Sequence, residues 1–296
     1  MATQLVPLPE VERLSTSVIR ILAGNPGKFT LQGTNTYLVG RGTRRLLIDT
    51  GEGLPRWPTL LQSVLKDENA VVHEVLLTHW HHDHVKGIPD LLKICPQATV
   101  YKHQPSEKVE GQTDIKDGQV FKVEGATLEA FYTPGHAIDH MSFIFREEDA
   151  IFTGDNVLGH GTAVFEDLGA YIASLKKMER AVSGRAYPGH GTVIADATGK
   201  ITEYIKHRQQ REDEILRVLR FGRLDVESSQ QESPLSLSSW TPIQIVKIIY
   251  RDVPESLHVP ASHGVVLVLN KLEAEGKVEH DGASGEWRLS AQRPVL

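Results

Sequence analysis

Short apolar runs along the chain alternate with segments whose apolar residues recur at helical spacing. Val18–Leu22, Arg45–Asp49 and Val71–Leu77 are typical of strands, and the last is apolar and β-branched enough for a buried strand. Helical periodicity marks Trp57–Asp67 and Ile88–Ile94. Because strands and helices alternate, the pattern predicts an α/β protein or a mixed sandwich covered by helices.

The alternation continues to about residue 190. A further helix is expected at Leu168–Met178. Further strands are expected at Thr36–Val39, Ala98–Tyr101, Gln119–Val123, Thr127–Tyr132, Met141–Phe145, Ala150–Phe152 and Gly184–Tyr187.

The C-terminal part has a different organisation. Ala197–Arg223 is one long helical stretch, and a Ser-rich segment follows it. Two helices are then expected, Pro242–Tyr250 with Thr241 as its N-cap, and Pro260–Glu275 before Gly276 as a C-cap. A small hairpin would complete a winged-helix-like appendage. The predicted organisation is a catalytic domain over 1–223, a linker over 224–240 and the appendage over 241–296.

Composition narrows the functional classes. The 296 residues have ordinary globular usage and a net charge of −6, so no basic excess points to general nucleic-acid binding. Cys95 is the only cysteine, which excludes a disulfide scaffold and a cysteine-rich zinc site. No apolar run approaches the ~18 residues of a membrane helix, and no secretory signal pattern is found. We therefore expect no membrane association and a cytosolic protein, with the mitochondrial matrix as the alternative.

The segment Thr78–His84, THWHHDH, carries the chemistry. It follows the predicted strand Val71–Leu77 directly, so it is expected in a loop at a sheet edge. Imidazole and carboxylate groups suit Zn²⁺ or a similar ion. The four candidate ligands are His79, His81, Asp83 and His84. A solvated polar loop is the alternative, and the placement of so many histidines straight after a buried strand argues against it. So many ligands in one short segment indicate two metals.

Three later segments repeat the same order of an apolar strand and then a ligand-bearing turn. They end in His136 of TPGH, Asp155 of FTGD and His190 of YPGH. The glycines allow sharp turns and close approach of neighbouring side chains. Each segment alone is a weak signal, but together with the first cluster they complete two metal sites.

This set of motifs, from about Val18 to Val193, resembles the metallo-β-lactamase superfamily, of the glyoxalase II-like type. The resemblance implies a four-layer αβ/βα sandwich and two Zn²⁺ ions that activate a water as metal-bound hydroxide. It implies a first metal held by His79, His81 and His136, a second held by Asp83, His84 and His190, and Asp155 as the bridge. Asp83 is also the candidate catalytic residue: it either only ligates the metal or also orients the water.

Several other residues have two interpretations. His82 is expected to point away from the ligands, by alternation along an extended segment, as an orienting or surface residue. Asp49 either supports a ligand histidine or only forms a turn. His140 and His160 either line the pocket or have structural or solvent-exposed roles. Lys86, where relatives commonly have glycine, is expected at the surface rather than on an anionic substrate.

The departures from known branches narrow the activity. Antibiotic hydrolysis is disfavoured, because the zinc lactamases use a cysteine ligand and Cys95 lies outside every motif. Di-iron flavoproteins are disfavoured, because they carry a carboxylate where this chain has His81. Stretches such as LIDTGEG, LLTHWHHDH and FTGDNVLGHGT look similar to the lactamase-like endoribonuclease branch and to its fungal relatives that act as polyketide thioesterases.

Two substrate hypotheses follow from that similarity. In the first, the enzyme hydrolyses an acyl thioester linked to an acyl carrier protein or to coenzyme A, and the TGDNVLGHGT segment forms part of an acyl pocket. In the second, it is an endoribonuclease on single-stranded RNA. The helix Lys200–Arg223 carries seven basic and four acidic residues, only a mildly basic face. From Pro234 onward acidic residues outnumber basic ones, seven to six. This balance favours the thioesterase hypothesis.

Overall fold

The computed structural model describes residues 5–106, 108–224 and 239–290. The chain divides into two compact units, and the division falls within one long helix, between Tyr204 and Ile205. The first unit holds most of the chain before that point and contains both large sheets. The predicted boundaries at 223 and 241 stay predictions. Of the predicted linker 224–240, residues 225–238 lie outside the described residues.

The first unit begins with a seven-stranded sheet in which the strands are ordered β1 to β7. Strands β1 to β4 pair antiparallel and β4 to β7 pair parallel. The strands are β1 (Val11–Arg13), β2 (Val18–Leu22), β3 (Asn35–Val39), β4 (Arg44–Ile48), β5 (Val71–Leu77), β6 (Thr99–Lys102) and β7 (Thr113–Asp114). The crossover from β4 to β5 contains α1 (Arg56–Asp67), and the crossover from β5 to β6 contains α2 (His82–Val85) and α3 (Ile88–Ile94).

The second sheet has five strands in the order β12-β11-β10-β9-β8. All neighbours pair antiparallel except β11 and β12, whose crossover contains α4 (Leu168–Glu179). The strands are β8 (Val120–Val123), β9 (Ala126–Tyr132), β10 (Met141–Phe145), β11 (Ala150–Gly154) and β12 (Ala186–Pro188). A short 3₁₀ helix, Arg146–Glu148, joins β10 to β11.

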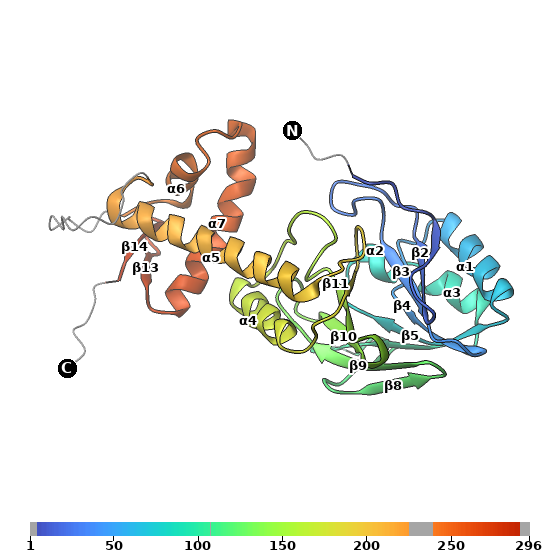
Figure 1. The fold of residues 1–296 in the computed structure, drawn as a ribbon. Coiled ribbons are helices and arrows are strands. Elements are labelled where there is room, and N and C mark those ends of the chain that lie inside the picture. Colours follow the sequence, from blue (N-terminus) through green and yellow to red (C-terminus); the bar gives the residue numbers. More distant parts are fainter. Residues whose placement is uncertain (1–4, 107, 225–238, 291–296) are drawn as a thin grey trace. The chain divides into compact units, whose positions relative to one another are not determined.

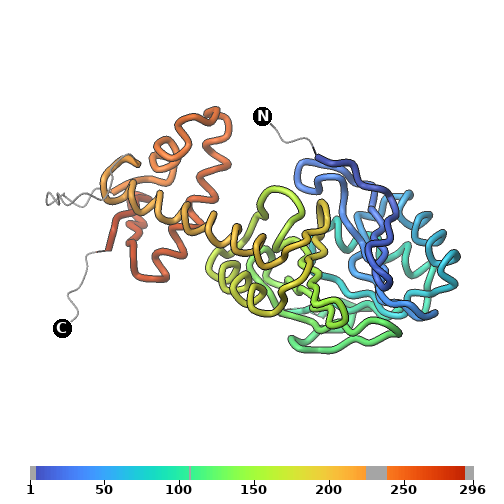
Figure 2. The backbone as a smooth tube through the Cα atoms, viewed as in Figure 1, coloured from blue at the N-terminus to red at the C-terminus, as the bar shows by residue number. Residues whose placement is uncertain are grey.

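Two apolar layers hold the first unit together. Between the sheets, Tyr37 of β3 meets Phe152 of β11 edge-on with ring centroids 5.2 Å apart, and Phe152 stacks on Tyr187 of β12. On the other face of the first sheet, α1 and α3 cover alternate residues, and the buried Trp57 donates its indole N–H to Thr36. Figures 1 and 2 show α1 and α3 outside the first sheet and α4 beside the second. The α/β fold expected from the sequence is confirmed.

The second unit is a small helical bundle with a hairpin. It contains the rest of α5 (Ala197–Phe221), a 3₁₀ helix (Glu255–Leu257), and the elements α6 (Pro242–Ile249), α7 (His258–Ala274), β13 (Val278–Asp281) and β14 (Glu286–Leu289). The buried carboxylate of Glu212 and the half-buried Lys271 ammonium lie 2.7 Å apart and link α5 to α7. The described part of the chain contains no helix with the length and apolar content of a membrane span.

Local signals fixed the ends of these elements. Thr241 and Gln244 form the capping box that starts α6. Gly276, at φ +71°, ends α7, and the N–H of the next residue bonds back to Leu272 O at 2.9 Å. The short edge strands β1 and β7 were not predicted from the sequence. The prediction that Thr78–His84 is extended throughout was wrong, because α2 begins at His82.

Candidate metal centre

Each candidate ligand lies just after the carboxyl end of a strand or in the short segment that follows it. Parallel neighbours end at the same edge of a sheet, and this holds for β4 with β5 and for β11 with β12. Asp49 follows β4, His79 follows β5, Asp155 follows β11 and His190 follows β12. Residues more than a hundred positions apart in the sequence thereby converge on one place.

Three imidazole nitrogens form what we call the first ligand group. His79 Nε2 and His81 Nδ1 lie 2.9 Å apart, and His136 Nε2 lies 3.3 Å and 3.0 Å from them. Four ligands at the usual Zn–N distance of about 2.0–2.1 Å, placed tetrahedrally, would be separated by about 3.3 Å. The three nitrogens therefore have the spacing of ligands around one small cation.

The outer nitrogens of this group are fixed by hydrogen bonds. His136 Nδ1 donates to Val164 O at 2.8 Å. Thr78 Oγ1 donates to Asp49 Oδ2 at 2.9 Å and lies 2.9 Å from His79 Nδ1, whose N–H it accepts. Each bond places the ring proton on Nδ1 and leaves Nε2 with a free lone pair facing the group, as metal ligation requires.

Asp83, His84 and His190 form the second ligand group. Asp83 Oδ2 lies 3.3 Å from His84 Nε2 and 3.2 Å from His190 Nε2. The other nitrogen of His84 donates to buried Asp49 at 2.7 Å. Asp49 therefore contacts His84, a candidate ligand, and does more than form the turn in which it lies, at φ +58°.

Asp155 lies between the two groups. Its Oδ1 is 3.4 Å from His84 Nε2, and its Oδ2 is 3.2 Å from His190 Nε2 and 3.7 Å from His136 Nε2. Among the described residues, His84 Nε2 and Asp155 Oδ1 are buried without a hydrogen-bond partner. Buried polar atoms of this kind are rare unless an ion or water satisfies them, so this donor set fits a bound metal.

The electrostatics of the two groups differ. Burial lowers the pKa of His79 well below its usual value and also lowers that of His81. Burial acts in the same direction on His190, but Asp155 and Asp83 outweigh it and raise its pKa to about 9. The pKa of His84 is raised in the same way by Asp155 and Asp49 against the effect of burial. Near pH 7 His79 and His81 are therefore neutral, and the second group contains cationic histidines beside carboxylates.

Two glycines make the convergence sterically possible. A Cβ on Gly189 would lie 2.4 Å from Asp155 Oδ1 and 3.0 Å from the His84 ring. A Cβ on Gly135, at φ +129°, would lie 2.3 Å from the backbone of Tyr171 in α4. The glycine before each of the late histidines is thus required by close approach.

The remaining candidates lie outside both groups. His82 and Lys86 are exposed. The exposure of His82 comes from its place at the start of α2, and not from alternation of side chains along an extended segment. His140 is fully buried, and its Nε2 accepts the backbone N–H of Asp155 at 3.2 Å, so it holds the backbone of Asp155 in place. His160 is half-buried, and Val157 in the same segment is fully buried. The acyl pocket expected from this segment stays a prediction.

One residue of the site was missed by the sequence analysis. Thr34 Oγ1 donates to Asp83 Oδ2 at 3.0 Å from the loop before β3. A lone threonine in a turn-rich segment carries no sequence signal of this role, because its partner lies 49 positions away.

The comparisons with known proteins agree with this architecture. Residues 29–190 match the metallo-beta-lactamase superfamily, and residues 241–287 match the beta-lactamase associated winged helix domain. An atrochrysone carboxyl ACP thioesterase from Aspergillus chevalieri is 46% identical over 296 aligned positions, covering 98% of this chain and 92% of the relative. A lactamase-like protein from Pestalotiopsis fici is 44% identical over 285 positions, covering 95% and 88%.

Solved structures show the same fold. A beta-lactamase domain protein from Burkholderia ambifaria superposes with a TM-score of 0.76 at 16% identity, covering 98% of this chain and 96% of that one. At this identity the likeness concerns the fold alone. Because the superfamily match spans more than half of the chain and the curated relatives align along nearly all of it, this protein is a hydrolase of the metallo-β-lactamase superfamily with a C-terminal winged helix domain.

Proposed function

We propose that this hydrolase cleaves an acyl thioester carried by an acyl carrier protein in polyketide biosynthesis, with two Zn²⁺ ions in the two ligand groups. The observation that carries the substrate class is the 46% identity, along 98% of the chain, to a relative named as a carrier-protein thioesterase. The reaction consumes one water, breaks the carbonyl carbon–sulfur bond and releases a carboxylic acid and a thiol. The proposed ligands are His79, His81 and His136 for one ion, Asp83, His84 and His190 for the other, and Asp155 between them.

The side chains around the ligands support this chemistry. When bound, the ions would supply an activated water and polarise the scissile carbonyl. Asp155 contacts both groups and holds them at a fixed separation. Asp49 and Thr78 keep the ligand histidines His84 and His79 in the required tautomers. His190 and His84 hold the pKa of Asp83 well below its usual range, against the effect of burial, so its carboxylate is ionised. An ionised carboxylate at this position can accept a hydrogen bond from the water and orient it.

Apolar side chains beside the first ligand group suit an acyl chain better than a phosphodiester. Trp80, Ile138 and Val164 are 46%, 64% and 57% exposed. The Trp80 ring packs edge-on against the His81 imidazole with centroids 4.6 Å apart. Val164 accepts the hydrogen bond of His136, and Ile138 lies two residues after that histidine. These three residues, the apolar rim, offer uncharged surface next to the first group.

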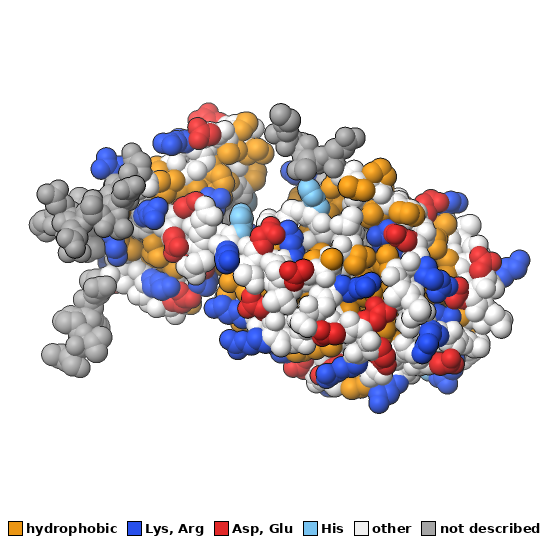
Figure 3. All heavy atoms as spheres, in the orientation of Figure 1, with side chains coloured by type: hydrophobic (Ala, Val, Ile, Leu, Met, Phe, Trp, Pro, Cys, Tyr) orange, Lys and Arg blue, Asp and Glu red, His pale blue; other side chains and the backbone are white. Residues whose placement is uncertain are grey.

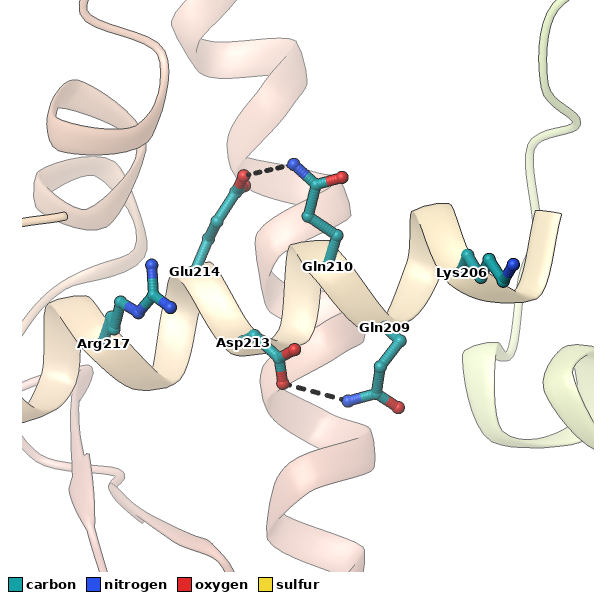
Figure 4. Close-up of a pocket in the computed structure, with 6 residues that line it drawn as sticks. All are labelled: Lys206, Gln209, Gln210, Asp213, Glu214 and Arg217. Carbon is teal, nitrogen blue, oxygen red and sulfur yellow. Dashed lines mark hydrogen bonds between the residues drawn. The ribbon is translucent and has the colours of Figure 1, made fainter. Parts of the chain in front are cut away.

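Cations of α5 lie beside carboxylates, which disfavours a phosphate track along this helix. Lys200 pairs with Glu203 at 2.9 Å, and Arg211 pairs with Glu214 at 2.6 Å. A hollow of about 310 Å³ on α5, shown in Figure 4, is lined by Lys206, Gln209, Gln210, Asp213, Glu214 and Arg217. Its glutamines bond to its carboxylates at 3.1 Å and 3.2 Å. On the face drawn in Figure 3, acidic and basic side chains are interspersed. A mixed surface of this kind gives little attraction for RNA.

A paired assay tests the proposal. The zinc-loaded full chain is incubated with aromatic acyl thioesters of a pantetheine analogue and, separately, with labelled single-stranded RNA, with the Asp155→Ala protein as the blank. Thiol release that needs zinc and is absent from the blank, with intact RNA, is the expected result. RNA cleavage that is lost in the blank, with thioesters untouched, would replace the thioesterase proposal by the endoribonuclease hypothesis.

A further inference from the structure

Thr34 and Asn25 form a buried hydrogen-bonded pair behind Asp83. The Thr34 backbone N–H donates to Asn25 Oδ1 at 2.8 Å, and Asn25 Nδ2 lies 3.0 Å from Thr34 Oγ1. Thr34 Oγ1 in turn lies 3.0 Å from Asp83 Oδ2. Both Thr34 and Asn25 are buried, so water does not compete for these bonds.

The direction of each hydrogen bond follows from the chemistry of the groups. Because a backbone N–H can only donate, the atom of Asn25 that faces it must be the carbonyl oxygen, and the NH₂ group must face the Thr34 hydroxyl. The NH₂ group also only donates, so the hydroxyl oxygen accepts from it. The single hydroxyl proton of Thr34 is then left for Asp83, whose ionised carboxylate only accepts.

The same Asp83 oxygen faces the second ligand group. Oδ2 lies 3.3 Å from His84 Nε2 and 3.2 Å from His190 Nε2, besides its bond to Thr34. The loop that carries Thr34 is also fixed to His190, since Thr34 and His190 form a β-bridge and Gly33 O lies 3.4 Å from His190 Nδ1. One short loop thus holds two of the three members of the group.

We propose that Thr34, oriented by Asn25, is a positioning residue that fixes Asp83 as a one-oxygen ligand through Oδ2 and leaves Oδ1 to accept a hydrogen bond from the reacting water. The inference rests on the proposed metal site and not on the proposed substrate. Without the Thr34 proton, the carboxylate can rotate and share both oxygens with the ion, which weakens the match to the two histidines.

Zinc binding tests this role independently of catalysis. The metal-free full chain is titrated with zinc in competition with a chromophoric chelator, which separates the affinities of two ions. Thr34→Val should weaken the second ion about 10–100-fold and leave the first within about threefold, as is typical for loss of an outer hydrogen bond. Thr34→Ser, which keeps the hydroxyl, should restore the wild-type affinity. If Thr34→Val does not fold, Thr34→Ala serves as the variant without a hydroxyl.

Thr36→Val is the matched control. Thr36 is buried two residues further on. Its hydroxyl donates to Ile21 O at 2.8 Å and accepts the indole N–H of Trp57 at 2.9 Å, and neither partner is a proposed ligand. This variant should bind both ions as the wild type does. Wild-type affinity for the second ion in Thr34→Val, or an equal loss in Thr36→Val, would overturn the role of Thr34. A wild-type chain that takes up only one ion would instead contradict the proposed two-metal site, and this inference with it.

Discussion

The two ligand groups lie side by side at the ends of strands from both sheets, and they are built from different chemistry. The first consists of imidazoles, and burial keeps His79 and His81 neutral. The second places His84 and His190 against Asp83 and Asp155, which favour their protonated forms. A zinc ion in the first group meets free lone pairs, whereas an ion in the second must displace protons. Two adjacent sites can therefore respond to pH separately, although Asp155 lies beside both.

The largest expected effect comes from losing Asp155 or His79, because metal binding itself should then fail. Asp155→Ala deletes a carboxylate that lies beside ligands of both groups, so both ions should be lost or severely weakened and turnover should fall to the level without enzyme. His79→Ala should likewise abolish activity, by loss of the first ion. Metal analysis of the purified variants, alongside the thioester assay, measures this. Wild-type turnover in either variant would contradict the ligand assignment.

A smaller change should separate the groups. Asp49→Asn offers a carboxamide in place of the carboxylate that accepts from His84 Nδ1, so the second ion should bind about 10–100-fold more weakly. The first ion should be affected less, because Asp49 reaches His79 only through Thr78. Chelator competition measures both affinities. Equal weakening of the two ions would show that the groups form one inseparable unit.

Acidity should separate the groups further. The carboxylates, acting against burial, raise the pKa of His190 to about 9, so this residue carries a proton below that pH when no metal is bound. Each proton that the ion displaces contributes about tenfold per pH unit, and the pKa of His84 is raised as well, so affinity for the second ion should rise at least about tenfold per pH unit up to pH 9. The first ion should show little change above pH 7, because burial lowers the pKa of His79. Zinc titrations at several pH values would reveal this; parallel pH dependences of both ions would contradict it.

The smallest effect concerns the apolar rim beside the first group. Trp80→Ala removes exposed aromatic surface next to His81 without touching a ligand atom. We expect KM for an aromatic acyl thioester to rise about tenfold, the range of a lost aromatic contact, with kcat and zinc content nearly unchanged. Trp80→Phe is the conservative control and should recover most of the affinity. A fall in kcat at constant KM would instead place Trp80 in the chemistry.

Local sequence signals accounted for most elements of the fold. The buried strand β5 and the helix α1 follow directly from apolar periodicity, and the ends of α6 and α7 from Thr241, Pro242 and Gly276. Such features depend on neighbours a few residues apart, which the sequence contains in full. The edge strands β1 and β7 were missed because two or three half-exposed residues carry no periodicity, and their partners in the sheet define them.

The same distinction between local sequence signals and contacts made by the fold applies to the site. Which residues could ligate was predictable from residue types, because four candidate ligands lie in one short segment and His136, Asp155 and His190 each follow a strand and a glycine. The contacts of Asp49 with His84, of His140 with the backbone of Asp155, and of Thr34 with Asp83 became visible in the folded chain alone. Ligand identity is encoded by residue type, but hydrogen-bonded support comes from whatever side chain the fold brings within about 3 Å, and that depends on how the two sheets meet.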